Sequence, residues 1–148
     1  MTTDVLTRPL RAEDSGILAC MEREIFTVPW TEQMFADLLT RDYSLYLVAE
    51  TDGQVVGCAG LTMLGEEGDI DKVMVDERFR RQGVAAMLLR ELIDNAGQKG
   101  ITSFTLEVRE SNRPAICLYE RFGFRSEGVR PGFYEKPAED ALIMWRRP

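Results

Sequence analysis

The sequence predicts an α+β, or mixed α/β, domain built around one sheet. Two β-rich runs, 44–50 and 54–64, are joined by Asp52-Gly53, which is a strong signal for a tight hairpin. In residues 83–97 the apolar side chains recur at helical spacing instead. Strand-like and helix-like segments then alternate to the end of the chain, so the predicted order is β-α-α-β-β-β-α-β-α-β-β.

The first elements are one strand and two helices. Residues 5–11 (VLTRPLR) read as a short strand, and Pro9 places it at an edge because proline cannot donate to a sheet ladder. Asp14 can cap a helix that runs to about Phe26, and Thr31 can cap a second helix to about residue 40. The apolar face of the first helix is predicted at Ile17, Met21 and Ile25.

The remaining elements follow the hairpin. Residues 70–75 (IDKVMV) form the next strand, and the helix 83–97 presents Ala85, Leu88, Leu89, Leu92 and Ala96 on one face. A strand is expected at 102–108 and a helix from about Pro114, which suits a first helical turn, to just before Gly123. Residues 124–129 and 141–147 are the last predicted strands.

Length and charge limit the classes of function. The 148 residues suit a single domain, 1–148. The chain has no apolar run of about 18 residues and no signal-peptide core at its start, so we expect a cytoplasmic protein without a membrane partner. Its net charge of −7 disfavours nucleic acid as a partner.

The residues that usually bind metals are scarce. The chain has no histidine and three cysteines, Cys20, Cys58 and Cys117, which show no C-x-x-C spacing. We therefore expect no metal site and interpret the cysteines as small buried thiols.

The segment RRQGVA (80–85) lies between a predicted strand and a predicted helix. Gly83 allows a ligand to approach the backbone, and a helix start offers free N–H groups, so the segment can bind phosphate. An ordinary turn with solvated arginines remains the alternative at this point.

Glu107 and Tyr119 are candidates for proton transfer. In TSFTLEV, Glu107 shares a face with Ser103 and Thr105, and partial burial would make it a better base near neutral pH. A structural reading would pair Glu107 with Arg109 or leave it in solvent. Tyr119 lies on an apolar helix stripe and reads equally as a core aromatic, and Asn112 reads as a helix cap.

These pieces together resemble the GNAT acetyltransferase superfamily. Its R/Q-x-x-G-x-G/A signature is matched by Arg80, Gly83 and Ala85, and the flanking N-x-x-A-I-x-L-Y-E-x-x-G-F is matched from Asn112 to Phe124. Within the superfamily the chain is most similar to the bacterial ribosomal-protein alanine N-acetyltransferases. That similarity rests on Pro29-Trp30-Thr31, on 107–112, on RPGFYE (130–135) and on 140–144.

The resemblance implies a mixed, mostly antiparallel sheet of about seven strands with about four helices. It implies direct transfer of acetyl from acetyl-CoA to a protein N-terminus, with a small-subunit ribosomal protein as partner and a monomer favoured. Glu107 would be the base and Tyr119 the acid, with Trp30, Arg130 and Tyr134 binding the acceptor. Acetyl-CoA would be bound by Val73, Met74, Val75, Arg80, Arg81, Gln82, Gly83, Val84, Ala85, Ala86 and Asn112.

Two departures from the subgroup concern the acceptor. Asp71 and Lys72 stand where a more apolar strand with an asparagine is expected, and Phe133-Tyr134 replaces paired tyrosines. A small amine or a lysine side chain therefore remains an alternative acceptor, and a silent CoA-binding module an alternative function. A loop at 130–136 that covers the pocket would favour a small amine, whereas an open groove beside 27–30 would favour a peptide.

Overall fold

The computed structural model describes residues 4–148, and a single seven-stranded sheet runs through it in the order β1-β2-β3-β4-β5-β7-β6. Neighbouring strands are antiparallel except β4 and β5, which are parallel. The strands are β1 (Leu6–Pro9), β2 (Ser44–Thr51), β3 (Gln54–Leu64), β4 (Glu67–Val75), β5 (Ser103–Arg109), β6 (Arg125–Tyr134) and β7 (Glu139–Arg146). The predicted fold class is confirmed.

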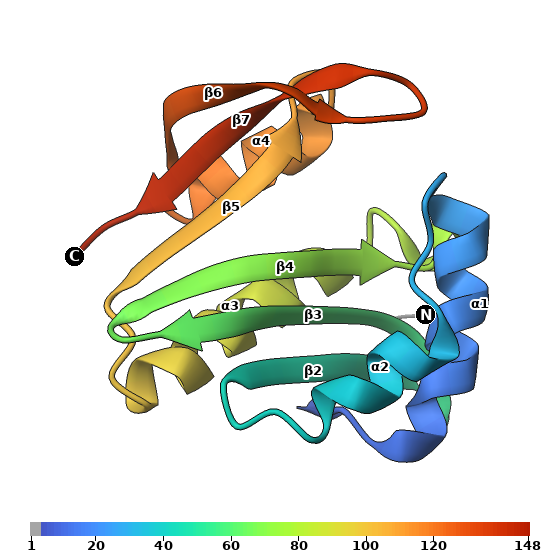
Figure 1. Ribbon diagram of the computed structural model, residues 1–148. Coiled ribbons are helices and arrows are strands. Elements are labelled where there is room, and N and C mark those ends of the chain that lie inside the picture. The colour runs from blue at the N-terminus through green and yellow to red at the C-terminus, as the bar shows by residue number, and fades with distance from the viewer. Residues whose placement is uncertain (1–3) are drawn as a thin grey trace.

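Helices cover both faces of the sheet (Figure 1). They are α1 (Ser15–Ile25), α2 (Glu32–Leu38), α3 (Val84–Gln98) and α4 (Arg113–Arg121), with short 3-10 turns η1 (Ala12–Asp14) and η2 (Glu77–Phe79). One core cluster joins α1 and α2 to one face, and the other joins α3 and α4 to the opposite face. No helix within residues 4–148 has the length and apolar character needed to cross a lipid bilayer.

The N-terminal helices differ in part from expectation. Thr31 caps α2 as predicted, because its hydroxyl accepts the Met34 N–H at 3.2 Å. Asp14 precedes α1, but its carboxylate makes no cap bond. Its Oδ2 and Oδ1 instead accept bonds from Arg8 Nη1 and Nη2, each at 2.8 Å. An ion pair to β1 has therefore replaced the expected cap.

Exposure corrects two further predictions. Ile17 is 45% exposed, so the buried stripe of α1 is rotated towards Leu18 and Met21. Cys58 is buried, but Cys20 and Cys117 are exposed, contrary to the expected three buried thiols. Both cysteines are flanked by apolar residues in sequence, but neighbours in a helix point about 100° apart, so apolar flanks do not imply burial.

Strands β4 and β5 separate after a short paired stretch (Figure 1). Only Glu67, Gly68 and Asp69 pair with β5, and the two strands then diverge. Just beyond, the β3–β4 register skips Asp71, which forms a bulge. Tyr46 Oη and Thr62 Oγ1 donate to Asp71 Oδ2 at 3.0 and 2.9 Å, and these bonds hold the bulge in place.

Residues 130–134 belong to a strand and not to a loop, contrary to the sequence interpretation, and only Glu135 of the segment 130–135 lies in a turn. Strand β6 continues to Tyr134, but between Arg130 and Tyr134 it contains more residues than the facing part of β7. The extra residues bulge out at Gly132, whose φ of 63° suits glycine and whose N–H donates to Asp140 Oδ1 at 2.8 Å. The bulge brings an aromatic pair, Phe133 and Tyr134, to the gap between β4 and β5.

Candidate active site

The gap between β4 and β5 exposes backbone groups of β4. The Asp76 N–H donates to the Val56 carbonyl of β3 at 2.8 Å. Since peptide groups alternate in direction along a strand, those of Val73 and Val75 point the other way, into the gap. Arg80 Nε reaches the Val75 carbonyl at 3.4 Å. These groups can pair with an extended ligand.

The start of α3 lies just beyond the end of β4. Gly83 is the cap residue with φ of 79°, and the Met87 N–H is bonded to its carbonyl. The first N–H groups of an α-helix have no intrahelical partner, so those of Val84 to Ala86 are free to bind an anion. A Cβ on Gly83 would meet no atom within 4 Å, so a ligand has open access to the backbone.

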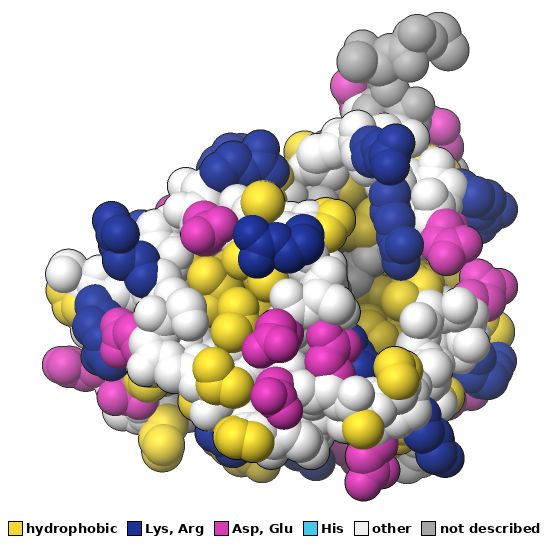
Figure 2. All heavy atoms as spheres, turned by 90° about the horizontal axis from the view of Figure 1, so that it is seen from above, with side chains coloured by type: hydrophobic (Ala, Val, Ile, Leu, Met, Phe, Trp, Pro, Cys, Tyr) yellow, Lys and Arg dark blue, Asp and Glu magenta, His cyan; other side chains and the backbone are white. Residues whose placement is uncertain are grey.

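A cavity of about 460 Å³ occupies the gap. Its walls come from the α1–α2 connection, from β4, from β5 with the start of α4, and from the end of β6. Figure 2 shows this hollow in the face seen from above, with charged side chains of both signs around it. Val73, Glu107, Asn112, Tyr119 and Tyr134 all line it, so the structure brings together predicted residues from four elements.

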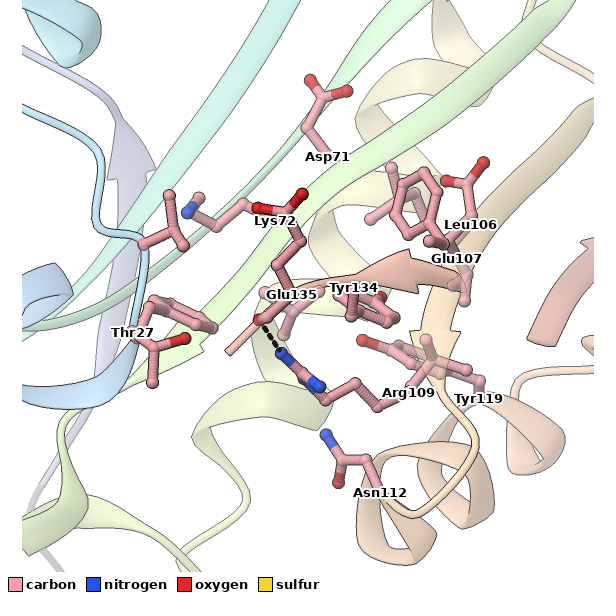
Figure 3. Close-up of a pocket in the computed structure, with 16 residues that line it drawn as sticks. Thr27, Asp71, Lys72, Leu106, Glu107, Arg109, Asn112, Tyr119, Tyr134 and Glu135 are labelled. Atoms are coloured by element: carbon pink, nitrogen blue, oxygen red, sulfur yellow. Dashed lines mark hydrogen bonds between the residues drawn. The ribbon is translucent and has the colours of Figure 1, made fainter. Parts of the chain in front are cut away.

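Glu107 lies on the cavity wall at the end of β5 (Figure 3). Burial raises the pKa of its carboxyl above the ordinary value, the charge of Asp69 adds to the rise, and Arg130 opposes it. The predicted alternative partner, Arg109, does not pair with it. Arg130 of β6 does, with Nη2 3.3 Å from Oε1.

Tyr119 approaches from the other face of the sheet, on α4. Its side chain is 9% exposed, and its ring centroid lies 5.9 Å from that of Phe124. Burial, with a smaller effect of Tyr134, raises its pKa to about 12. The phenol therefore stays protonated at neutral pH. Tyr119 packs in the core, as the structural interpretation expected, and it also lines the cavity.

Arg109 holds Tyr134 over the cavity, a role that the sequence did not indicate. Its guanidinium lies 4.4 Å from the Tyr134 ring centroid. It also donates to the carbonyl of Glu135 at 3.1 Å (Figure 3). Further bonds from Arg109 reach the Pro137 carbonyl at 3.0 Å and the Glu139 carboxylate at 3.2 Å. One side chain at the end of β5 thus fixes the β6–β7 connection and its aromatic residue.

A buried ion pair supports the opposite wall. Glu22 of α1 is fully buried and accepts bonds from Lys72 Nζ and from the Trp30 N–H. The Lys72 ammonium also lies 4.7 and 4.1 Å from the ring centroids of Phe26 and Trp30. Lys72 and Phe26 line the cavity, whereas Trp30 packs behind them against Phe35.

Asn112 caps α4 as the sequence suggested. Its Oδ1 accepts the Ala115 N–H at 3.3 Å, and Pro114 lies in the first turn. Because Asn112 also lines the cavity, its amide group is available to a ligand there. The signature segment 80–86, by contrast, lies at the start of α3 rather than on the cavity wall.

Known proteins share this arrangement. Residues 17–124 match the Acetyltransferase (GNAT) family. A Bacillus subtilis (strain 168) protein, named as a candidate ribosomal protein bS18-alanine N-acetyltransferase, is 36% identical over 146 residues, which are 98% of this chain and 97% of that protein. The ribosomal protein bS18-alanine N-acetyltransferase of Escherichia coli (strain K12) is 32% identical over 126 residues, 84% of each chain.

A solved structure shows the same likeness in fold. The crystal structure of the ribosomal-protein-S18-alanine N-acetyltransferase from Escherichia coli superimposes with a TM-score of 0.90 at 29% identity, covering 97% of this chain and 94% of that one. The match in sequence and in fold extends across the cavity and the start of α3. The chain belongs to the GNAT acetyltransferase family.

Proposed function

We propose that this acetyltransferase, as a single domain of residues 1–148, acetylates the N-terminal α-amine of a protein. The proposed acceptor is a ribosomal protein with N-terminal alanine. The acetyl group passes directly from acetyl-CoA to its amine within a ternary complex. The observation that carries the proposal is the mouth of the cavity. Phe26, Val28 and Phe133 are 38%, 63% and 44% exposed there, so apolar contacts are available to a peptide beyond its first residue.

Family membership implies acetyl-CoA, which supplies acetyl as an activated thioester. The N–H groups of 81–86, with Arg80, are proposed to hold its pyrophosphate, and those of 84–86 are free at the helix start. Of the segment 73–75, the gap-facing peptide groups of Val73 and Val75 suit its extended pantetheine, whereas those of Met74 face β3. A β4 N–H aimed at the acetyl carbonyl would stabilise negative charge on its oxygen. Asn112 would contact the same ligand.

Glu107 is the proposed base. An α-amine has a pKa of about 7.7–8.0, against about 10.4 for lysine, so a sizeable share of an N-terminus is already neutral near pH 7.5. Glu107 takes the remaining proton, directly or through one water. Its burial favours this role, because a raised pKa strengthens a carboxylate as a base.

Tyr119 is the proposed acid, and it protonates the leaving sulfur. Because its pKa is raised to about 12, its phenol is a weaker acid than tyrosine in water. Burial against the same wall would also disfavour the free thiolate, and this favours its protonation as it leaves. Glu107 and Tyr119 come from opposite faces of the sheet and so suit opposite ends of one transfer.

A small polyamine or a lysine side chain is the second candidate acceptor. Asp71 and Glu135 also line the cavity, and carboxylates attract any cationic amine. Charge alone therefore does not separate the candidates, and the exposed apolar rim is what favours a peptide.

A panel of acceptors tests the proposal. Acetyl-CoA turnover is measured with peptides that begin with Ala, Ser or Met, with an N-terminally blocked lysine peptide and with a polyamine. We expect the highest kcat/KM for the Ala peptide. A higher kcat/KM for the blocked lysine peptide or the polyamine would establish the second candidate instead.

A further inference from the structure

The carboxylate assigned as base has a cationic partner. Arg130 Nη2 lies 3.3 Å from Glu107 Oε1, and the side chains are 54% and 24% exposed respectively. The pair joins β5 to β6 across β7; Glu107 lines the cavity, whereas Arg130 is not among the lining residues. An arginine that is more than half exposed keeps most of its hydration, so such a contact is weak and can be exchanged.

The charges around Glu107 give Arg130 a second place to go. Asp69 of β4 pairs in register with Thr105, so Asp69 shares a face with Thr105 and Glu107. The charge of Arg130 lowers the pKa of the Asp69 carboxyl as well as that of Glu107. The charge of Glu107 raises the pKa of Tyr134 of β6. The β7 residue opposite Glu107 is the uncharged Ile143.

The position of Arg130 on β6 also permits movement. It is the last residue in register with β7 before the bulge of 131–133, and its guanidinium lies 5.4 Å from the Phe133 ring centroid. When the guanidinium leaves Glu107, the Phe133 ring remains beside it and the negative charge of Asp69 attracts it. No backbone rearrangement is needed for this exchange, since a long side chain has several rotamers.

We propose that Arg130 is a displaceable counterion of Glu107, which it pairs with in the free enzyme and releases to the ammonium of the arriving acceptor. This inference rests on the proposed function, because it takes Glu107 as the base. One cation replaces another at Oε1, so the Glu107 carboxylate keeps a cationic partner until it takes up the proton. A neutral molecule cannot make this exchange, and the pair therefore selects for an amine that arrives protonated. Arg130 is thus a positioning residue, and its guanidinium need not contact the acceptor.

Arg130→Met tests the proposal, since methionine keeps an unbranched apolar stem and removes the charge. The first measurement is an NMR titration of the Glu107 carboxyl, which needs neither acetyl-CoA nor acceptor. Arg130 lowers the pKa of Glu107, so its loss is expected to move the titration to higher pH. The acid limb of kcat/KM is expected to move in the same direction, because the base must be ionised.

The second measurement is KM for the amine that the wild type acetylates best. Without its competitor, the acceptor ammonium is expected to bind better, and KM to fall by roughly two- to five-fold, the scale of an exposed ion pair. Arg147→Met is the matched control, because Arg147 forms an exposed pair with Glu127 on the same sheet. It is expected to change neither the titration nor KM.

Two results would overturn the proposal. An unchanged Glu107 titration in Arg130→Met would mean that the pair does not form in solution. A rise in KM would mean that Arg130 binds the acceptor directly, as the family resemblance implies. If the wild type acetylated no peptide α-amine, the proposed acceptor would fail, whereas the titration and the KM of the preferred amine would still decide the role of Arg130.

Discussion

The two ends of the site offer a ligand different chemical groups: backbone groups at one end and side chains at the other. At the end near α3, the groups available to a ligand are the gap-facing peptide groups of Val73 and Val75 and, beyond the cavity wall, the first N–H groups of α3, 84–86. At the end near β6 and the α1–α2 connection, they are side chains held by other side chains: Tyr134 by Arg109, Glu107 by Arg130, and Lys72 by Glu22. The proposed acetyl-CoA end therefore depends on local chain conformation, and the proposed acceptor end on contacts between distant segments.

Glu107→Gln should separate the two ends most strongly. The amide cannot take up a proton, so we expect kcat/KM to fall by about 10³-fold or more, within the range of general base catalysis. Binding of acetyl-CoA should be nearly unchanged, because Glu107 is not one of the groups proposed to bind it. Steady-state kinetics and calorimetric titration with acetyl-CoA measure the two effects.

Glu127→Gln is the matched control for that variant. Glu127 is an exposed carboxylate on β6, paired with Arg147, and its substitution should leave kcat/KM near the wild-type value. Wild-type turnover by Glu107→Gln would remove Glu107 from its role as base.

Lys72→Met tests whether the acceptor end depends on its ion pair. It leaves Glu22 fully buried without its cationic partner, and breaking such a pair costs about 3–5 kcal/mol of unfolding free energy. Urea unfolding followed by tryptophan fluorescence measures this loss. The double variant Glu22→Gln with Lys72→Met should recover most of it, and a double variant as unstable as the single one would contradict the account.

Tyr119→Phe should act on turnover alone. Removing the hydroxyl leaves the ring in its core position against Phe124, so stability should change little. Loss of the acid should lower kcat by about 10²-fold. If melting temperature and acetyl-CoA affinity stay constant while kcat also stays constant, Tyr119 is only a core residue.

Gly83→Ala should give the smallest effect, and it should weaken acetyl-CoA binding instead of acceptor turnover. A side chain at φ of 79° is strained, and its Cβ would stand where phosphates approach the start of α3. We expect KM for acetyl-CoA to rise about tenfold, a loss of roughly 1.4 kcal/mol, with little change for the acceptor.

Gly53→Ala is the control for backbone strain. Gly53 has φ of 76° and equally open surroundings, but it lies in the β2–β3 hairpin. Both variants should lose similar stability, and only Gly83→Ala should lose acetyl-CoA affinity. An equal loss of affinity in both would show that strain, and not the position of Gly83, is responsible.

The same contrast explains how much the sequence could predict. The hairpin at Asp52-Gly53, the stripe of α3 and the alternation around Glu107 are local patterns, and the structure reproduces them. The arrangement of predicted residues around the gap was available only through the family resemblance. Local patterns determine the backbone conformation, and backbone groups form the proposed acetyl-CoA end.

The acceptor end could not be predicted in the same way. Glu22 and Lys72 are 50 residues apart, and Arg109 reaches carbonyls 26 and 28 residues further along. No periodicity indicates such pairs, because each partner looks like an ordinary exposed charge until the strands are placed. The bulge that carries Tyr134 differs from the loop that the family resemblance implied, because its register depends on pairing with β7.

The most direct test offers both kinds of amine in one molecule. A peptide that begins with alanine and contains one lysine is incubated with acetyl-CoA and the protein, and tandem mass spectrometry locates the acetyl group. The account predicts acetylation of the N-terminal α-amine, with the lysine left free during the initial phase of the reaction. Preferential acetylation of the lysine, while the α-amine stays free, would contradict it.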